Sequence, residues 1–264
     1  MKIKNLRGAK MKNFILFTCI FIFLLFPFNF AYATRPLYTV DTVITPFTHI
    51  VIESGLLLQS QRDNSGFSEV ITAARYGLNQ NTELILTLPY ISRQAEGGNF
   101  DGLSNGVFNV KYNFFSGAGG NISAAYLFGI QIKSNDKGNG LNANRSDITN
   151  MLIWSHDIGF CKYLLNFGYT FDDEPAGQPQ NDFILYNIAM TKPLNDSINF
   201  TGEVQYSKNT YTGDIFGETA IGINWRVFPK LVLDAALGCG LNENSSSSNF
   251  VFGATYNLDY PGEQ

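Results

Sequence analysis

Segments of about ten residues in which apolar and polar side chains alternate recur along most of this chain. Within residues 198–207, Ile198, Phe200, Val204 and Tyr206 lie on one side of a period-two pattern, and every residue on the other side is polar. Successive side chains of a β-strand point to opposite faces of its sheet, so such a segment has one apolar and one polar face. The alternation therefore predicts an all-β fold.

The pattern predicts about twelve strands, each long enough for a tilted strand to cross a bilayer. We expect them at residues 47–60, 67–76, 82–91, 103–114, 121–133, 146–157, 161–172, 182–192, 197–207, 214–227, 230–241 and 249–259. The alternation is less regular in 147–157 and 182–192, where the sequence leaves the phase open.

The N-terminus has the order of a secretory signal peptide. A basic stretch is followed by an apolar run from Phe14 to Phe30 and then by the small-x-small site Ala31-Tyr32-Ala33. A membrane anchor is the alternative, but the run is short of the ~20 apolar residues that a spanning helix needs. We expect cleavage after Ala33. The leader carries five of the 18 basic residues and none of the 22 acidic ones, so the mature chain has a net charge of −9.

Short and long connections alternate between the expected strands. The short ones are residues 77–81, 116–120, 158–160, 193–196 and 228–229. Outer-membrane barrels have short periplasmic turns and longer outer loops. Because lipid offers no partners to backbone N–H and C=O groups, a sheet in lipid must close. A soluble β-sandwich or lipocalin-like barrel would show similar alternation, and the leader, strand lengths and loop asymmetry favour a transmembrane antiparallel up-and-down β-barrel.

Three segments resemble a known bacterial family. They are residues 35–41 (RPLYTVD), 74–90 (ARYGLNQNTELILTLPY) and 102–112 (GLSNGVFNVKY). They are similar to segments of the outer-membrane transporter family associated with the meta-cleavage pathway of phenol degradation. Val40 interrupts the threonine-aspartate-aspartate expected in the first segment. The resemblance covers residues 35–114 and implies an outer-membrane transporter, without establishing phenol as a substrate.

Charged side chains within the expected strands should face the lumen, since Arg or Lys facing lipid at the bilayer midplane costs about 2–4 kcal/mol. Two interpretations stay open: a lining that selects solutes, or cross-strand ion pairs that fill a narrow barrel. The candidate lumen residues are Glu53, Glu69, Arg75, Glu83, Lys111, Lys162, Glu203, Glu218, Arg226 and Asp234.

Residues for catalysis or metal binding are scarce. The only histidines are His49 and His156, and Ser155 should face away from its neighbour His156 because adjacent strand residues point to opposite sides. Cys161 and Cys239 should lie at opposite barrel ends as free thiols, beyond the ~7 Å Cα separation that a disulfide spans. We expect no enzyme activity, no cofactor and no metal site. The acidic mature chain also disfavours nucleic-acid binding.

The sequence thus predicts a signal peptide at 1–33, an N-terminal periplasmic segment at 34–46, a barrel at 47–260 and a C-terminal tail at 261–264. The expected location is the bacterial outer membrane, with both termini periplasmic. The expected partners are outer-membrane lipid, the barrel-assembly machinery and small-molecule solutes, and the oligomeric state is left open. The expected function is passive movement of small, hydrophobic or aromatic solutes; the alternative is a non-transporting structural or surface-binding barrel with a filled lumen.

Overall fold

A computed structural model describes residues 38–61, 65–95, 98–132, 146–172 and 182–258. The predicted leader and C-terminal tail lie outside these residues. The strands are β1 (Ile50–Ser60), β2 (Gly66–Gly77), β3 (Thr82–Ala95), β4 (Gly98–Leu103), β5 (Gly106–Ser116), β6 (Ile122–Ile132), β7 (Ile148–Asp157), β8 (Lys162–Phe171), β9 (Phe183–Pro193), β10 (Ile198–Asn209), β11 (Ile215–Phe228), β12 (Leu231–Gly240) and β13 (Ser248–Asn257), with a 3-10 turn η1 (Ala118–Gly120).

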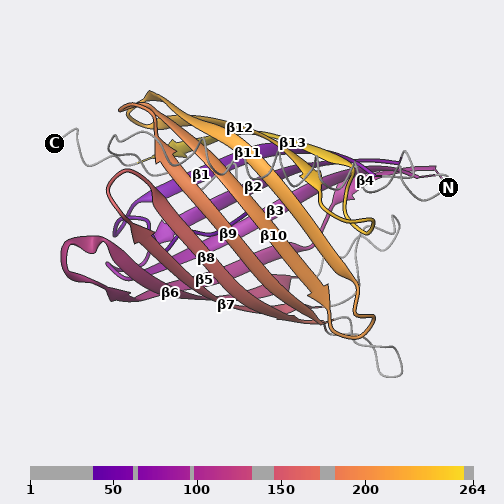
Figure 1. Cartoon of the computed structure of the whole chain (residues 1–264), viewed down its shortest axis with the longest axis horizontal. Coiled ribbons are helices and arrows are strands. Elements are labelled where there is room, and N and C mark those ends of the chain that lie inside the picture. The colour runs from indigo at the N-terminus through magenta and orange to yellow at the C-terminus, as the bar shows by residue number, and fades with distance from the viewer. Residues whose placement is uncertain (1–37, 62–64, 96–97, 133–145, 173–181, 259–264) are drawn as a thin grey trace, which may run out of the picture.

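The strands form one antiparallel up-and-down sheet that closes on itself (Figure 1). Sequential strands are neighbours, and β1 pairs with both β2 and β13, from Val51↔Asn257 to Ser60↔Ser248. Because β4 and β5 lie one after the other beside β3, the 13 strands make a twelve-stranded barrel. The predicted fold class is confirmed.

The strand expected at 103–114 is interrupted in the structure. Its C-terminal part belongs to β5, which pairs with residues 82–87 of β3. The preceding strand, β4, pairs with residues 90–95 of β3. β3 and β4 therefore include residues that the sequence pattern assigned to a connection. The break falls at Ser104 and Asn105, where the Ser104 N–H donates to the carbonyl of Pro89 (2.9 Å).

The short connections lie together at one end of the barrel, which we call the short-turn end. They are the turns β2–β3, β5–β6, β7–β8, β9–β10 and β11–β12. The opposite end, called the loop end, carries the connections β1–β2, β3–β4, β6–β7, β8–β9, β10–β11 and β12–β13. This segregation follows from the antiparallel order, which returns the chain to the same end after every second strand.

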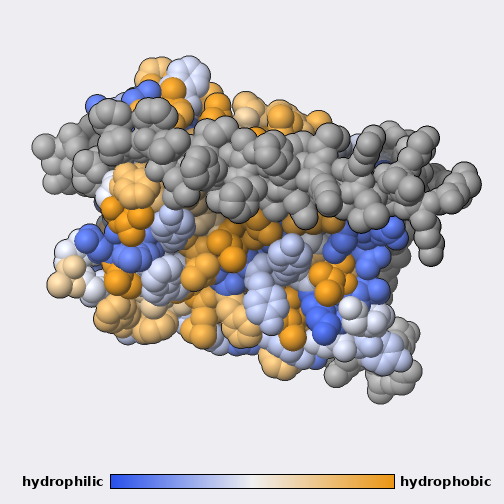
Figure 2. Space-filling view, viewed as in Figure 1, coloured by the Kyte–Doolittle hydropathy of each residue, from blue (hydrophilic) through white to orange (hydrophobic). Residues whose placement is uncertain are grey.

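The outer wall is apolar, and the inner wall is mainly polar. Exposed outward side chains include Leu152, Phe167, Ile188, Ile223 and Phe252. In the space-filling view hydrophobic residues spread over the visible wall, and the strongly hydrophilic ones gather mostly toward its two ends (Figure 2). A barrel surrounded by lipid requires this distribution. No helix among the described residues is long and apolar enough to cross a membrane.

The structure also fixes the phase of the two less regular strands. In β7 the inward side chains include Met151 and Ile153, which pack with Ala125 and Leu127 of β6. In β9 Ala189 packs inside against Leu164 of β8. The inner face is apolar over this part of the wall, so both faces of β7 are apolar there and period-two alternation fades.

A pair of adjacent substitutions tests the assignment of the two faces. Leu86 is exposed on the outer wall, whereas Thr87 lines a cavity in the lumen. We expect Leu86→Arg to lower the free energy of unfolding by about 2–4 kcal/mol, and Thr87→Arg to lower it by less than about 1 kcal/mol. Denaturant unfolding of the protein in lipid vesicles measures both. A larger loss for Thr87→Arg would reverse the assigned faces.

The two cysteines of the described residues are free, as the sequence predicts. Cys161 is buried beside the β7–β8 turn, and Cys239 is exposed near the loop end of β12. We expect a lipid-permeant maleimide to label only Cys239 in the folded mature protein and both thiols after unfolding. Mass spectrometry counts the labels, and Cys239→Ser should remove the label of the folded state. An internal disulfide would contradict the topology.

Candidate functional site

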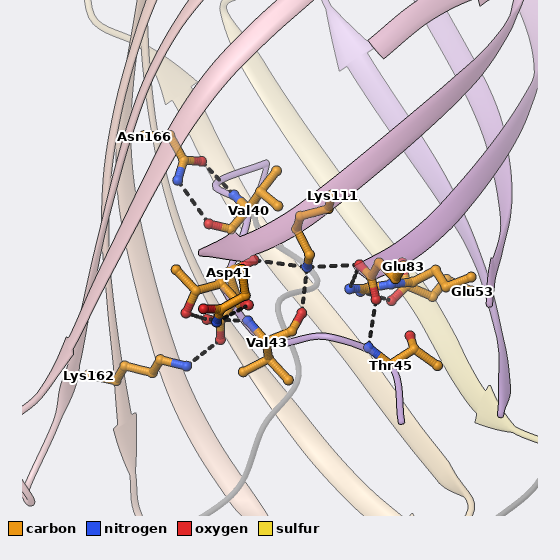
Figure 3. Close-up of polar contacts among 12 residues, drawn as sticks. Val40, Asp41, Val43, Thr45, Glu53, Glu83, Lys111, Lys162 and Asn166 are labelled. Carbon is orange, nitrogen blue, oxygen red and sulfur yellow. Dashed lines mark hydrogen bonds and ion pairs between the residues drawn. The ribbon is translucent and has the colours of Figure 1, made fainter. Parts of the chain in front are cut away.

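The lumen holds a segment of the chain that precedes the barrel. Residues 38–46, here called the lumen segment, lie inside the wall and contact side chains from strands on several sides (Figure 3). The sequence predicts an N-terminal periplasmic segment at residues 34–46, and the structure places the described part of it, residues 38–46, within the barrel. Such a segment must satisfy its backbone groups with side chains, because it adds to no strand ladder.

The first part of the lumen segment is bound by a carboxylate and an amide. Glu203 of β10, itself 3% exposed, accepts hydrogen bonds from the N–H groups of Tyr38 (3.0 Å) and Thr39 (2.9 Å), and from the Thr39 hydroxyl (2.8 Å). Asn166 of β8 accepts from the Val40 N–H (2.6 Å) and donates to the Val40 carbonyl (2.9 Å). Asn166 therefore pairs with Val40 much as a neighbouring strand would.

A network of charges holds the middle of the segment. Lys111 of β5 is fully buried, and its ammonium donates to the carbonyls of Asp41 (3.0 Å) and Val43 (2.5 Å). The same nitrogen lies 2.8 Å from Glu83 Oε1. Glu83 Oε2 in turn accepts from the Thr45 N–H (2.7 Å). Lys111 and Glu83 thus neutralise each other's charge, and both side chains bind the segment.

Arg75 extends this network to a second carboxylate. Its guanidinium lies 2.5 Å from Glu83 Oε1 and 3.0 Å from Glu53 Oε1. Arg75 comes from β2, Glu83 from β3 and Glu53 from β1, so the ion pairs connect three adjacent strands across the inner wall. Charge-assisted hydrogen bonds of this kind are among the stronger polar contacts in proteins.

The next three strands along the wall, β6 to β8, bind the segment through Asp41 and Thr42. The Asp41 carboxylate pairs with Lys162 of β8 at 2.5 Å. The Thr42 hydroxyl lies 2.6 Å from that of Ser123 and 2.7 Å from that of Ser155, on β6 and β7. The segment therefore contacts the consecutive strands β3, β5, β6, β7 and β8, and it occupies the lumen at the short-turn end.

The end of the lumen segment lies against the β2–β3 turn, and this contact explains the glycine at that position. A Cβ added to Gly77 would lie 2.1 Å from the Pro46 carbonyl oxygen, so no larger residue fits there without movement. The Thr48 N–H donates to the Gly77 carbonyl (2.9 Å), and Thr48 has a φ of 66°. A β-branched residue rarely adopts this conformation, so the contact with Gly77 holds a strained corner where the segment enters β1.

A cavity of about 280 Å³ adjoins the lumen segment. Tyr38, Thr39 and Val40 of the segment form part of its lining. Its wall is apolar at Leu57, Ile71, Ile85, Leu127 and Val251 and polar at Glu53, Arg75, Thr87 and Asn109. The cavity can therefore accommodate a small solute that has both apolar and hydrogen-bonding parts.

The structure brings together seven of the ten candidate lumen residues around the segment or the loop-end mouth. Glu53, Arg75, Glu83, Lys111, Lys162 and Glu203 make the contacts described above, and Glu218 lies near the loop end. Glu69, Asp234 and Arg226 lie elsewhere along β2, β12 and β11. Glu69 pairs in register with Leu57, and Asp234 with Asn224.

Sequence reasoning missed the partners supplied by the segment itself and by neutral side chains. Asp41 and Thr39 were named only because they lie in a segment that carries the family resemblance. Asn166 was not predicted as a site residue. The contacts join residues far apart in the sequence, 126 positions for Val40 and Asn166 and 164 for Thr39 and Glu203. A polar side chain at an inward position of an expected strand is the only signal that could have suggested Asn166.

Ser155 and His156 do not form a catalytic pair in this structure. Ser155 is buried on the lumen side and lies 2.7 Å from the Ser123 hydroxyl, whereas the His156 ring contacts Trp154 on the other face, with ring centroids 5.5 Å apart. Catalysis by a serine needs a histidine within hydrogen-bond reach of its hydroxyl.

Comparison with known structures identifies the class of fold. Comparison with protein-family models gives no match, and comparison with curated protein sequences gives none at a significant level. Among solved structures, an outer membrane channel from Pseudomonas putida F1 aligns with a TM-score of 0.67 over 86% of this chain and 100% of that one, at 10% identity. The NanC porin aligns at 0.58 over 79% and 100%, and the KdgM porin at 0.52 over 79% and 99%, both at 10% identity.

These similarities define the chain as a barrel with the fold of outer-membrane channels and porins. At such low identity they concern the fold alone. The chain spans nearly the full length of each of these structures, so the common fold includes the whole barrel.

Removal of the buried ammonium tests the network that holds the segment. Lys111→Met leaves the carbonyls of Asp41 and Val43 without this donor, and we expect a loss of about 3–5 kcal/mol in the free energy of unfolding. Amides of residues 39–45 should exchange hydrogen faster. Lys208→Met, at an exposed lysine of β10, is the matched control and should change stability by less than about 0.5 kcal/mol. Equal stability of both variants would refute the role given to Lys111.

Proposed function

We propose that this protein is a passive outer-membrane channel for small solutes. The observation that carries the proposal is a closed barrel with an apolar outer wall and a polar lumen that retains a cavity of about 280 Å³. The fold common to an outer membrane channel and two porins supports it. In this proposal the lumen segment sets the width of the path, because it occupies the short-turn end.

The chemistry of the solute follows from the cavity. Leu57, Ile71 and Ile85 offer an apolar surface, and Thr87 and Asn109 offer hydrogen-bonding groups. Small amphipathic solutes, including aromatic ones, match this lining. The resemblance of residues 35–114 to transporters of the phenol meta-cleavage pathway points in the same direction. In this proposal the ion pairs among Arg75, Glu83 and Lys111 stabilise the wall and hold the segment in place.

The proposal includes an orientation. The short-turn end faces the periplasm and the loop end faces outward, as in barrels with short periplasmic turns. Both termini are then periplasmic, and the lumen segment enters from the periplasmic side after cleavage of the leader. The barrel-assembly machinery would insert the chain. The separation of Ser155 from His156 supports a role without catalysis.

A second candidate function is favoured by the same segment. Because residues 38–46 are bonded to several strands of the wall, the lumen could be a filled interior that serves only the stability of a structural or surface-binding barrel. The two functions differ in one measurable property, which is the passage of ions and solutes through the isolated protein.

Conductance and liposome swelling with the purified mature protein test the channel function. We expect both, and we expect Asn166→Leu to raise the mean conductance, because it removes both hydrogen bonds to Val40. Asn187→Leu is the matched control: Asn187 is paired in register with Asn166 and is also buried. No conductance and no solute uptake by either the parent or Asn166→Leu would favour the filled barrel.

A further inference from the structure

A carboxylate is held in a fixed position inside the loop end of the lumen. Glu218 of β11 accepts hydrogen bonds from Gln59 Nε2 (3.2 Å), Ser246 Oγ (2.7 Å) and Asn249 Nδ2 (3.1 Å). In the part of the chain that the structure describes, each of these three partners is a neutral donor. Neutral donors orient a carboxylate and leave its negative charge in place.

The origin of these partners places the carboxylate inside the barrel. Gln59 belongs to β1, which is separated from β11 by β12 and β13 in the sheet order. Side chains of strands that are not neighbours can meet only across the lumen. Asn249 comes from β13, on the same inner face as the buried Val251.

The β12–β13 connection fixes the mouth around Glu218. Its residues Ser245 and Ser246 are 4% and 3% exposed, so this part of the loop is folded inward. The Gly217 N–H donates to the Ser245 hydroxyl (2.7 Å), and the Gly240 N–H donates to the Ser246 carbonyl (3.0 Å). The loop therefore holds Ser246 against Glu218.

The lumen carboxylates differ in how they are balanced, and Glu203, which is 3% exposed, is bonded to the neutral donors of the lumen segment. At the short-turn end, Glu53, Glu83 and Asp41 are each within ion-pair distance of Arg75, Lys111 or Lys162. At the loop end, Glu218 is bonded to amides and a hydroxyl. A fixed charge inside a low-dielectric wall concentrates ions of opposite sign and excludes those of the same sign.

We infer that Glu218 is a specificity-determining residue that makes the lumen admit cations in preference to anions of similar size. The inference rests on the proposed channel function. Acidic side chains placed around a pore have this effect in cation channels. For ions that pass about 8 Å from the carboxylate in water, the Coulomb energy attracts a cation and repels an anion, and with the screening of about 0.1 M salt the two effects together correspond to a preference of about twofold.

Reversal potentials of the purified full mature protein in a planar bilayer, under a potassium chloride gradient, measure the preference. We expect a potassium-to-chloride permeability ratio above one, lowered about twofold by Glu218→Gln, whose side chain has nearly the same shape. Glu218→Asp keeps the charge and should keep most of the ratio. Glu243→Gln, at an exposed glutamate of the same loop, is the matched control and should change the ratio by less than about a fifth.

The outcomes separate this inference from the channel function on which it rests. Conductance with a ratio at or below one, or a ratio that Glu218→Gln and Glu243→Gln change equally, overturns the role of Glu218 and leaves the channel intact. A Glu218→Asp variant that loses the preference together with Glu218→Gln shows that shape, not charge, matters, and also overturns it. Absence of conductance in the parent protein overturns the proposed function itself.

Discussion

The need of every backbone N–H and C=O for a partner in lipid is the constraint on which this structure depends. A bilayer core supplies no hydrogen bonds, so a sheet that spans it cannot have an edge. The β1–β13 ladder, ten register pairs from Val51↔Asn257 to Ser60↔Ser248, removes the edge. Once the sheet is closed, each strand has one face toward lipid and one toward the lumen. The period-two pattern of the sequence and the grouping of turns at the two ends are consequences of this closure.

Closure creates a second problem inside the barrel, and the same constraint governs its solution. The lumen segment adds to no ladder, so its peptide groups find side chains instead. Glu203 accepts from Tyr38 and Thr39, Asn166 pairs with Val40, and Lys111 donates to two carbonyls. Charged side chains that could not face lipid thus stabilise the irregular backbone of residues 38–46 at this end.

The wall was largely predictable from the sequence because its signal is local. Alternation along a strand depends on residues two positions apart, so Ile198, Phe200 and Val204 reveal an apolar face without any tertiary information. The sequence leaves the phase of a strand open where both of its faces are apolar. In β7, Met151 and Ile153 are inward and apolar and pack with Val40 of the segment, so both faces of the strand look alike.

The segment in the lumen could not be predicted, for a related reason. Its contacts join residues far apart in the sequence, such as Thr39 and Glu203, and hydrogen bonds between a backbone and distant side chains leave no periodic pattern. The inward placement of Glu83 and Lys111 followed from the cost of a charge in lipid. Their pairing with each other depends on the register of the strands, and their contacts with the segment depend on its path into the lumen. Alternation encodes neither.

The three segments that resemble one transporter family meet at a single place in this structure. Asp41 of the first, together with Val43 just after it, binds Lys111 of the third, and Glu83 and Gly77 of the second contact Lys111 and Pro46. The described parts of the three segments therefore come together in the anchoring of residues 38–46.

This anchoring and the solute cavity use the same groups. Tyr38, Thr39 and Val40, which Glu203 and Asn166 hold by hydrogen bonds, line the cavity. Arg75 also lines the cavity, and it forms an ion pair with Glu83. A solute in the cavity would contact the segment and its supports at once. Arg75 thus connects the lining of the cavity to the lumen segment through Glu83, which accepts a hydrogen bond from the Thr45 N–H.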